Sequence, residues 1–389
     1  MNRHIQSETG IALGGLIAMA AAVGIGRFVY TPILPFMEEG LGLTKVDASI
    51  IASANFLGYL LGALAASMDS LPGGRREWFL AGLAVSAITT GAMGLTDSLA
   101  VFLGLRFAGG VASAFVLVFA SALVLDRLAA AGRPALSAVH FAGVGCGIAM
   151  SAVIVAGLAA YGYGWRAQWF ASGAAAFLGF LALLRLIPTG PAPDRPATPP
   201  GTQTPGPNLI ALIVAYGLFG FGYIITATFI SSMVRASPDL RSVEPVVWLA
   251  VGLSAIPSVA LWTWIGRRLG NHRSFAIACL IESAGVAMSV LAGGAVAIVV
   301  AAALLGGTFM GITALGLINA RELSAGDPRR NLALMTAAFG LGQIIGPSFA
   351  GFAHSISNSF LAPSMVAAAA LAVAALLVMV PHRTVGAGS

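Results

Sequence analysis

Long apolar stretches without charged residues recur along almost the whole of this 389-residue chain, and they leave little scope for a water-soluble fold. A helix that crosses a bilayer needs about 20 mostly apolar residues. Hydrophobic residues make up 58% of the sequence and charged residues only 9%, whereas a typical soluble domain is roughly 25% charged. The chain therefore lacks the polar groups that a soluble enzyme, a secreted scaffold or a nucleic-acid binder needs. We predict an all-α polytopic membrane protein.

The predicted spans follow from cutting these stretches at glycine, proline and polar clusters. Twelve spans result, at residues 11–37, 44–67, 77–95, 99–125, 135–160, 166–187, 208–234, 245–265, 274–292, 296–320, 332–354 and 363–381. The first apolar stretch is too long for a signal peptide, and no small-residue cleavage site follows it.

The basic residues give a test of this span count. With the N-terminus in the cytoplasm, 14 of the 20 basic residues fall in cytoplasmic segments, whereas the outer loops hold only Lys45, Arg166, Arg235 and Arg241. Cytoplasmic loops are enriched in Lys and Arg. We therefore expect both termini in the cytoplasm. The arginine-, alanine- and glycine-rich composition indicates a bacterial protein, so the expected location is the inner membrane.

A proline-rich segment divides the twelve spans into two sets of six. Residues 188–207 contain eight prolines and almost no aliphatic side chains, which is typical of an extended, solvated linker. We predict a bundle at 1–187, a cytoplasmic linker at 188–207 and a second bundle at 208–389. An offset of 196 residues aligns the halves and matches Gly24 with Gly220, Gly26 with Gly222, Gly74 with Gly270, Gly110 with Gly306, and Asp126 with Glu322. Two parallel repeats of this kind are a transporter plan.

Two motifs resemble a known transporter group. Arg106, Gly110, Ala112 and Ala114 in the fourth span resemble the fourth-helix pattern of the major facilitator superfamily. The string GIGRFVYTP at 24–32 resembles the opening signature of its YbfB/YjiJ-like branch. This resemblance covers essentially the whole chain and implies a secondary transporter, without implying a substrate.

The loop between spans two and three departs from the superfamily pattern. Arg75 and Arg76 supply its basic end, but Ala66 stands where an aspartate belongs, and Asp69 has a different spacing. The gate-loop role that the resemblance implies for Arg75, Arg76 and Asp69 therefore lacks its usual charge relay. The fifth span also lacks the Gly-x-x-x-Gly-Pro pattern that is associated with antiporters.

Arg27 and Arg106 lie inside spans, at a similar distance from the predicted outer ends of helices one and four. A charge at the centre of a membrane helix costs at least about 2.5–3.5 kcal/mol, so it normally faces a cavity or a partner. One interpretation is a positive pocket that binds an anionic substrate group. The alternative is a structural arginine that bonds backbone carbonyls or extends toward the interface.

Other polar side chains in the spans complete the candidate site. Glu282 is a carboxyl group well inside a span, where low dielectric favours the neutral form, and we consider it for proton coupling. Tyr30, Tyr223, Thr226 and Gln343 lie on spans expected to border the cavity. Each of them could bind substrate or form an interhelical hydrogen bond.

The sequence thus favours a secondary transporter for a small organic solute, with a preference for anions and with coupling to protons. One alternative is a proton-antiport exporter of apolar or cationic drugs, and another is a sensor or structural protein with a transporter fold. We find no P-loop, nucleophile elbow or dinucleotide motif, so neither an enzyme nor a cofactor is expected, and no metal site or nucleic-acid partner. The lipid bilayer is the expected surrounding, and we expect a functional monomer.

Overall fold

The computed structural model describes residues 7–68, 71–187, 206–324 and 329–379. These residues form helices and connecting turns, with no strand among them. The α-helices are α1 (Glu8–Met19), α2 (Tyr30–Leu41), α3 (Lys45–Ala66), α4 (Arg75–Ala92), α5 (Leu99–Ala120), α6 (Asp126–Ala130), α7 (Ser137–Ala160), α8 (Trp165–Leu186), α9 (Pro207–Ala236), α10 (Glu244–Leu269), α11 (Asn271–Leu291), α12 (Ala295–Glu322), α13 (Arg329–Ser357) and α14 (Leu361–Met379).

Twelve helical segments in the described part of the chain are long and apolar enough to cross a membrane, which confirms the predicted number. Two of them combine several elements. The first runs over Glu8–Leu41 and contains α1, a π-helix at Ala20–Ile25 and α2. The fourth runs over Leu99–Ala130 and contains α5, a second π-helix and α6. Of the predicted linker, residues 188–205 lie outside the described residues, and Pro207 already begins α9.

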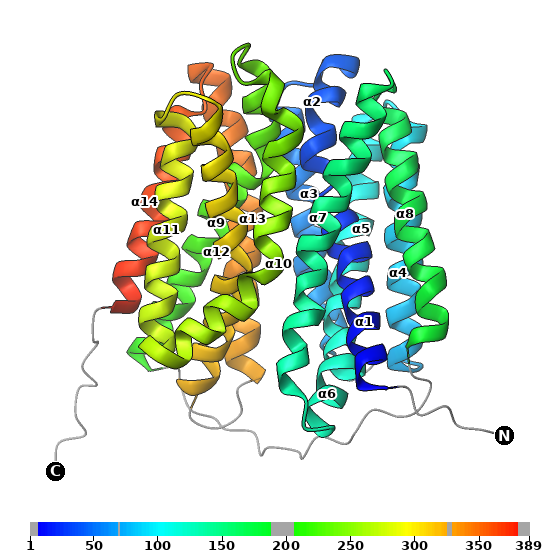
Figure 1. Ribbon diagram of the computed structural model, residues 1–389, viewed down its shortest axis with the longest axis vertical. Helices are drawn as coiled ribbons and strands as arrows, with labels where there is room; N and C mark the ends of the chain where they lie inside the picture. Colours follow the sequence, from blue (N-terminus) through cyan, green and yellow to red (C-terminus); the bar gives the residue numbers. More distant parts are fainter. Residues whose placement is uncertain (1–6, 69–70, 188–205, 325–328, 380–389) are drawn as a thin grey trace.

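The helices form two groups that follow the order of the chain (Figure 1). Helices α1–α8 gather on one side and α9–α14 on the other, and we call these groups the first and second halves. The start of α1 and the end of α14 lie at the bottom of the view, which we call the terminal face. The top, where α2 ends, is the distal face. The ribbons of the two halves lie closer together near the distal face than near the terminal face.

Glycines let the helices approach until their backbones touch. A Cβ atom added at Gly58 in α3 would lie 2.0 Å from the Phe107 carbonyl oxygen in α5, and one at Gly110 would lie 2.0 Å from the Asn55 oxygen. Glycine also allows close contact between the halves, where a Cβ at Gly252 in α10 would lie 2.3 Å from the Ala149 nitrogen in α7. Small residues allow such close approach in membrane helices. Here they bring the polar groups of neighbouring helices within reach.

The 196-residue offset has a direct counterpart in three dimensions. The Thr31 hydroxyl of α2 donates to the Ala227 carbonyl oxygen of α9 at 2.6 Å, and Glu39 pairs with Arg235 at 2.7 Å. Both pairs are separated by 196 residues. When two copies of a fold are related by a two-fold axis, a position that meets its own equivalent lies on that axis. Helices α2 and α9 therefore approach each other along the pseudo-two-fold axis.

Candidate functional site

A break in the first span exposes two backbone carbonyls at the centre of the first half. The π-helix ends at Ile25, and α2 begins only at Tyr30. Arg106 of α5 fills this break, because its Nη1 donates to the Gly26 carbonyl at 3.0 Å and its Nη2 donates to the Arg27 carbonyl at 2.9 Å. The side chain is buried. This is the geometry of the structural alternative, in which an arginine satisfies backbone groups.

Two further contacts hold Arg106 in place. Its guanidinium carbon lies 5.1 Å from the centre of the Tyr30 ring, and the Tyr30 hydroxyl donates to the Ala48 carbonyl at 2.8 Å. The Asn55 amide donates to the Arg106 carbonyl at 2.8 Å. Tyr30 thus contacts Arg106 through its ring and α3 through its hydroxyl. Arg106 and Tyr30 therefore hold the broken first span against α3 and α5.

Arg27 points toward the other half of the molecule. Its Nη2 donates to Oε1 of Gln343 in α13 at 2.7 Å, and the Gln343 amide nitrogen donates to the hydroxyl of Tyr223 in α9. All three side chains are buried. The structure therefore joins three of the predicted site residues in one chain of hydrogen bonds that crosses between the halves. Arg27 and Tyr223 are also equivalent positions under the 196-residue offset.

Aromatic rings rather than carboxylates surround the Arg27 guanidinium. Its central carbon lies 4.3 Å from the ring centre of Tyr59, 4.7 Å from that of Phe56 and 5.5 Å from that of Phe28. Within the described part of the chain, no ion pair includes Arg27, and its Nε has no hydrogen-bond partner. Rings attract a cation through their faces, but they do not neutralise it. The site thus holds a buried positive charge whose Nε–H has no partner in the described part of the chain.

A small cavity is lined in part by Phe28, whose ring lies near the Arg27 guanidinium, and by Tyr223, which ends the chain of hydrogen bonds from Arg27. It has room for about one water molecule. Its walls are apolar, and they are formed by Phe28, Ile148, Tyr223, Ala227, Trp248, Val251, Leu305 and Phe309. These residues come from both halves of the molecule. The cavity therefore lies at the interface that alternating access would open and close.

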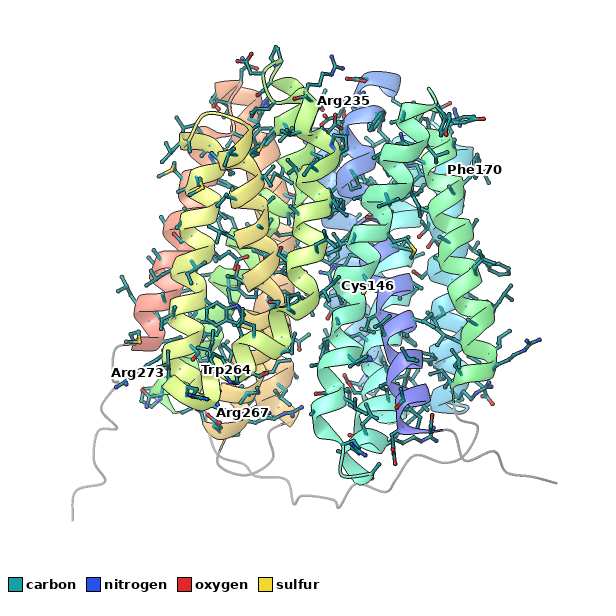
Figure 2. All side chains as sticks on the ribbon, viewed as in Figure 1. Cys146, Phe170, Arg235, Trp264, Arg267 and Arg273 are labelled. Atoms are coloured by element: carbon teal, nitrogen blue, oxygen red, sulfur yellow. The ribbon has the colours of Figure 1, made fainter. Side chains whose placement is uncertain are left out.

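Ion pairs also join the two halves. At the distal edge, Arg235 of α9 donates to both carboxylate oxygens of Glu39, at 2.7 and 2.8 Å, and to Glu244 at 2.9 Å. Its guanidinium carbon lies 3.9 Å from the Phe36 ring centre. Figure 2 places Arg235 at the top of the molecule. We call Phe36, Glu39, Arg235 and Glu244 the distal lock.

Two predicted site residues, Thr226 and Glu282, are buried but take no part in the hydrogen bonds between Arg27, Gln343 and Tyr223. Thr226 is buried in α9, next to the cavity residue Ala227, and its hydroxyl has no partner in the described part of the chain. Glu282 is fully buried in α11, and neither of its carboxyl oxygens has a hydrogen-bond partner among the described residues. Its helix packs against α9, the helix that carries Tyr223. Their roles in substrate binding and proton coupling stay predictions.

Two of the three gate-loop residues, Arg75 and Arg76, begin α4. Arg76 donates to the Leu184 carbonyl at 2.9 Å and satisfies the end of α8 within the first half. Arg75 is exposed at the start of α4, and Asp69 lies outside the described residues. The described part of the chain contains no group of three His, Cys, Asp or Glu side chains that could hold a metal ion. The candidate site therefore consists of arginine, amide and aromatic side chains.

Several functional candidates escaped the sequence prediction. Phe56 and Tyr59 face Arg27, while Trp248 and Phe309 line the cavity. Aromatic residues in an apolar span carry no signal that separates them from ordinary packing residues. For the distal lock a signal did exist, because Glu39 and Arg235 are 196 residues apart and carry opposite charges.

Comparison with known proteins decides the family. Residues 19–379 match the family model described as "Uncharacterised MFS-type transporter YbfB". The chain belongs to this YbfB-type family of the major facilitator superfamily. A curated relative, the "Uncharacterized MFS-type transporter YceJ" of Bacillus subtilis (strain 168), is 24% identical over 271 residues, which are 67% of this chain and 68% of the relative. This YbfB-type chain is therefore a membrane transporter, not an enzyme.

Solved structures with a similar fold support the same architecture. A point mutant of the nucleoside transporter NupG superposes with a TM-score of 0.74 at 14% identity, and the match covers 95% of this chain and 99% of the mutant. A second NupG structure gives a TM-score of 0.68 at 15% identity, with 96% and 98% covered. At these identities the likeness shows the fold alone. It confirms the predicted all-α plan of twelve membrane-spanning helices for the YbfB-type chain.

Proposed function

We propose that this YbfB-type transporter carries a small organic anion across the bacterial inner membrane by alternating access, with Arg27 as the anion-binding group. The observation that carries the proposal is the buried Arg27 guanidinium, which has no carboxylate partner in the described part of the chain. An unpaired buried charge is costly. A substrate carboxylate would neutralise it at the interface between the halves.

The Gln343 carboxamide supports this assignment. Its oxygen accepts from Nη2 of Arg27, while the neighbouring Nε is free. Nε and Nη2 together form one edge of the guanidinium, which matches the two oxygens of a carboxylate. Gln343 thus occupies half of the edge with a neutral oxygen. A bound carboxylate would displace it, and Gln343 would keep its hydrogen bond to Tyr223.

Arg106 takes a different role in this proposal. Both of its Nη atoms already bond backbone carbonyls, so although its Nε has no partner among the described residues, it offers less to a substrate than Arg27 does. Its bonds fix the break at Gly26 and Arg27, from which the Arg27 side chain extends. We assign it as a positioning residue, and Tyr30 as its support.

The sidedness follows from the basic residues and from the distal lock. Figure 2 places Arg267 and Arg273 near the terminal face, which fits a cytoplasmic side. The distal lock then joins the halves at the outer side in the described conformation. Single cysteines at positions 202 and 239, introduced after removal of Cys146 and Cys279, test this topology. An impermeant thiol reagent should label only position 239 in intact cells, and labelling of position 202 would reverse the assignment.

The substrate assignment is tested by thermal unfolding of the purified protein with a panel of monocarboxylates, dicarboxylates, phosphate esters, quaternary amines and nucleosides. A ligand at 100 times its Kd stabilises the folded state by about 2.7 kcal/mol. We expect monocarboxylates to raise Tm in the wild type and in the control Arg166→Gln, whose ion pair with Asp97 lies at the exposed rim. They should have no effect on Arg27→Gln.

Gln343→Glu sharpens the test. The new carboxylate would pair with Arg27 from inside, so the free protein should be at least as stable as the wild type and should no longer respond to monocarboxylates. Nucleosides are the alternative, uncharged class of substrate, because the similar solved structures are those of a nucleoside transporter. If nucleosides or amines raise Tm and no anion does, Arg27 is not an anion site.

Proton coupling through Glu282 is the finer part of the proposal. A fully buried carboxyl group without a hydrogen-bond partner in the described chain is most stable in its neutral form. Opening of the bundle toward water would let it release a proton. Glu282 lies in α11, which packs against α9, the helix that carries Tyr223, and this position would couple its protonation to the network that ends at Arg27.

A further inference from the structure

One of the rings around Arg27, that of Phe28, belongs to a series of aromatic contacts that extends along the cavity. The Tyr223 ring lies between the rings of Phe309 and Phe339, with centre distances of 5.7 and 5.8 Å and interplanar angles of 8° and 6°. Phe309 also lines the cavity, and it meets Phe28 edge to face at 6.0 Å. A stack of nearly parallel rings therefore ends at the cavity wall.

Only one of the two buried arginines presents a guanidinium edge that a ligand can take over. Arg27 and Arg106 each have an Nε without a partner in the described part of the chain, but the neighbouring Nη2 bonds a side chain, Gln343, in Arg27 and a backbone carbonyl in Arg106. A second negative charge on the ligand would find no cation in the apolar walls of the cavity. Buried charges need partners, so the geometry favours a monoanion over a dianion.

The uncharged part of the ligand must then fit the residues that line the cavity. Four of the eight residues that line the cavity are aromatic, and the other four are aliphatic. Aromatic pairs gain from stacked or edge-to-face contacts beyond the area that they bury. A flat ring could stack on Phe309 and meet the edge of Phe28, whereas a saturated ring of similar size would fill the same space without these contacts. A small polar acid would leave the walls without contacts.

We infer that the substrates of this transporter are aromatic monocarboxylates, with the carboxylate on Arg27 and the ring in the cavity against Phe309 and Phe28. This inference rests on the proposed function, because it takes Arg27 as the anion-binding group. The cavity in the described conformation holds only about one water molecule, so the ring enters as the halves separate. Binding displaces Gln343 from Arg27 and separates the rings around the cavity.

The test compares three probes that differ in one property each. Benzoate has both the ring and the charge, cyclohexanecarboxylate has the charge without the flat ring, and benzamide has the ring without the charge. Binding to the full-length protein in detergent is measured by calorimetry or by thermal shift. We expect benzoate to bind about tenfold more tightly than cyclohexanecarboxylate, the upper range for one aromatic pair, and benzamide to show no binding.

Two variants assign the effect to residues. Phe309→Leu should bring the affinity for benzoate down to that for cyclohexanecarboxylate while both still require Arg27. Phe177→Leu is the matched control, because Phe177 is an exposed ring on α8, with 42% of its surface accessible. It should leave both affinities unchanged.

The outcomes separate the two proposals. If cyclohexanecarboxylate binds as tightly as benzoate and Arg27→Gln abolishes both, the anion site stands and the aromatic inference is wrong. If benzamide binds as tightly as benzoate and binding survives Arg27→Gln, the cavity takes rings but the anion proposal fails. If none of the three probes binds to the wild type, the aromatic inference is likewise overturned.

Discussion

The distal lock offers the sharpest test of alternating access, because its central ion pair joins the two halves and a similar pair on the same face does not. Glu39 of α2 accepts two hydrogen bonds from Arg235 of α9. Asp97 likewise accepts from Arg166 at 2.6 Å through both of its oxygens, but these two residues belong to the first half. Glu39→Gln should therefore shift the equilibrium between the distal-closed and distal-open states, and Asp97→Asn should not.

The size of the shift follows from exposure. The Arg235 side chain is 16% exposed and that of Glu39 is 50% exposed. Hydrogen bonds to charged groups contribute about 1.5–3 kcal/mol when buried, while exposed ion pairs contribute about 0.2–1 kcal/mol. A half-exposed bidentate pair falls between these ranges, at about 1–2 kcal/mol. Since about 1.4 kcal/mol is a factor of ten, the closed-to-open ratio should fall by about 5- to 30-fold in Glu39→Gln.

Arg235→Gln should produce a larger shift than Glu39→Gln. It removes the same ion pair and also the contact of the guanidinium with Phe36, whose ring centre lies 3.9 Å away. It also leaves Glu244 without its partner, but Glu244 and Arg235 both belong to the second half, so this loss lowers stability in both states and does not add to the shift. The second ion pair of Glu39, with Arg241, joins side chains that are 50% and 59% exposed, so it adds little.

Distances between spin labels measure the shift directly. Labels at Tyr161 and Val296 report on the distal face, because these side chains are 85% and 78% exposed at helix ends of different halves. The background lacks Cys146 and Cys279, which are free thiols. Glu39→Gln should increase the population at long distance, while Asp97→Asn should give the distribution of the unmodified protein.

A second label pair distinguishes opening from unfolding. Labels at Arg133 and Leu269 report on the terminal face, where alternating access requires the distance to shorten when the distal face opens. If Glu39→Gln changes neither pair, or if Asp97→Asn produces the same changes as Glu39→Gln, the ion pair does not hold the halves together and the reasoning is refuted.

Three further changes have definite expected outcomes. Glu282→Gln should abolish proton-driven accumulation in proteoliposomes and leave substrate exchange intact; accumulation that persists under a pH gradient would exclude Glu282 as the coupling group. Gly58→Ala should destabilise the protein by about 1–3 kcal/mol, since its Cβ would lie 2.0 Å from the Phe107 oxygen, whereas Gly104→Ala, with no atom within 4 Å, should leave Tm unchanged. Arg106→Leu should lower Tm, because each of two buried carbonyls loses a partner at a cost of about 1–3 kcal/mol; a Tm equal to that of the wild type would contradict the positioning role.

The number of spans was predictable from the sequence because bilayer thickness fixes the length of an apolar helix. The similar depth of Arg27 and Arg106 was predictable for a related reason, since position along a helix converts directly into height. The structure places the Arg106 guanidinium against the Arg27 carbonyl at 2.9 Å. Depth alone, however, does not distinguish a substrate-binding arginine from one that satisfies backbone groups. Only the break between Ile25 and Tyr30 shows where the carbonyl acceptors are.

The partners of Arg27 lay beyond sequence reasoning for a different reason. Gln343 is 316 residues away, and its contact with Arg27 depends on how the halves meet. The rings of Phe56 and Tyr59 belong to a span in which aromatic and aliphatic residues serve the same apolar function. A hydrophobic pattern identifies the face of a helix that is buried, but it carries no information on which buried ring lies over a charge.

The pairs on the pseudo-two-fold axis explain how a duplicated fold carries a site without symmetry. A residue on the axis meets its own equivalent, so an identical pair of charges there would repel. The chain has Glu39 opposite Arg235, which converts repulsion into attraction between the halves. Arg27 and Tyr223 are also equivalent positions with different side chains, but they are joined through Gln343 instead of by direct contact. Divergence at equivalent positions thus gives one half the cation and the other half the ring, and this is how two similar bundles would form the single off-centre anion site that we propose.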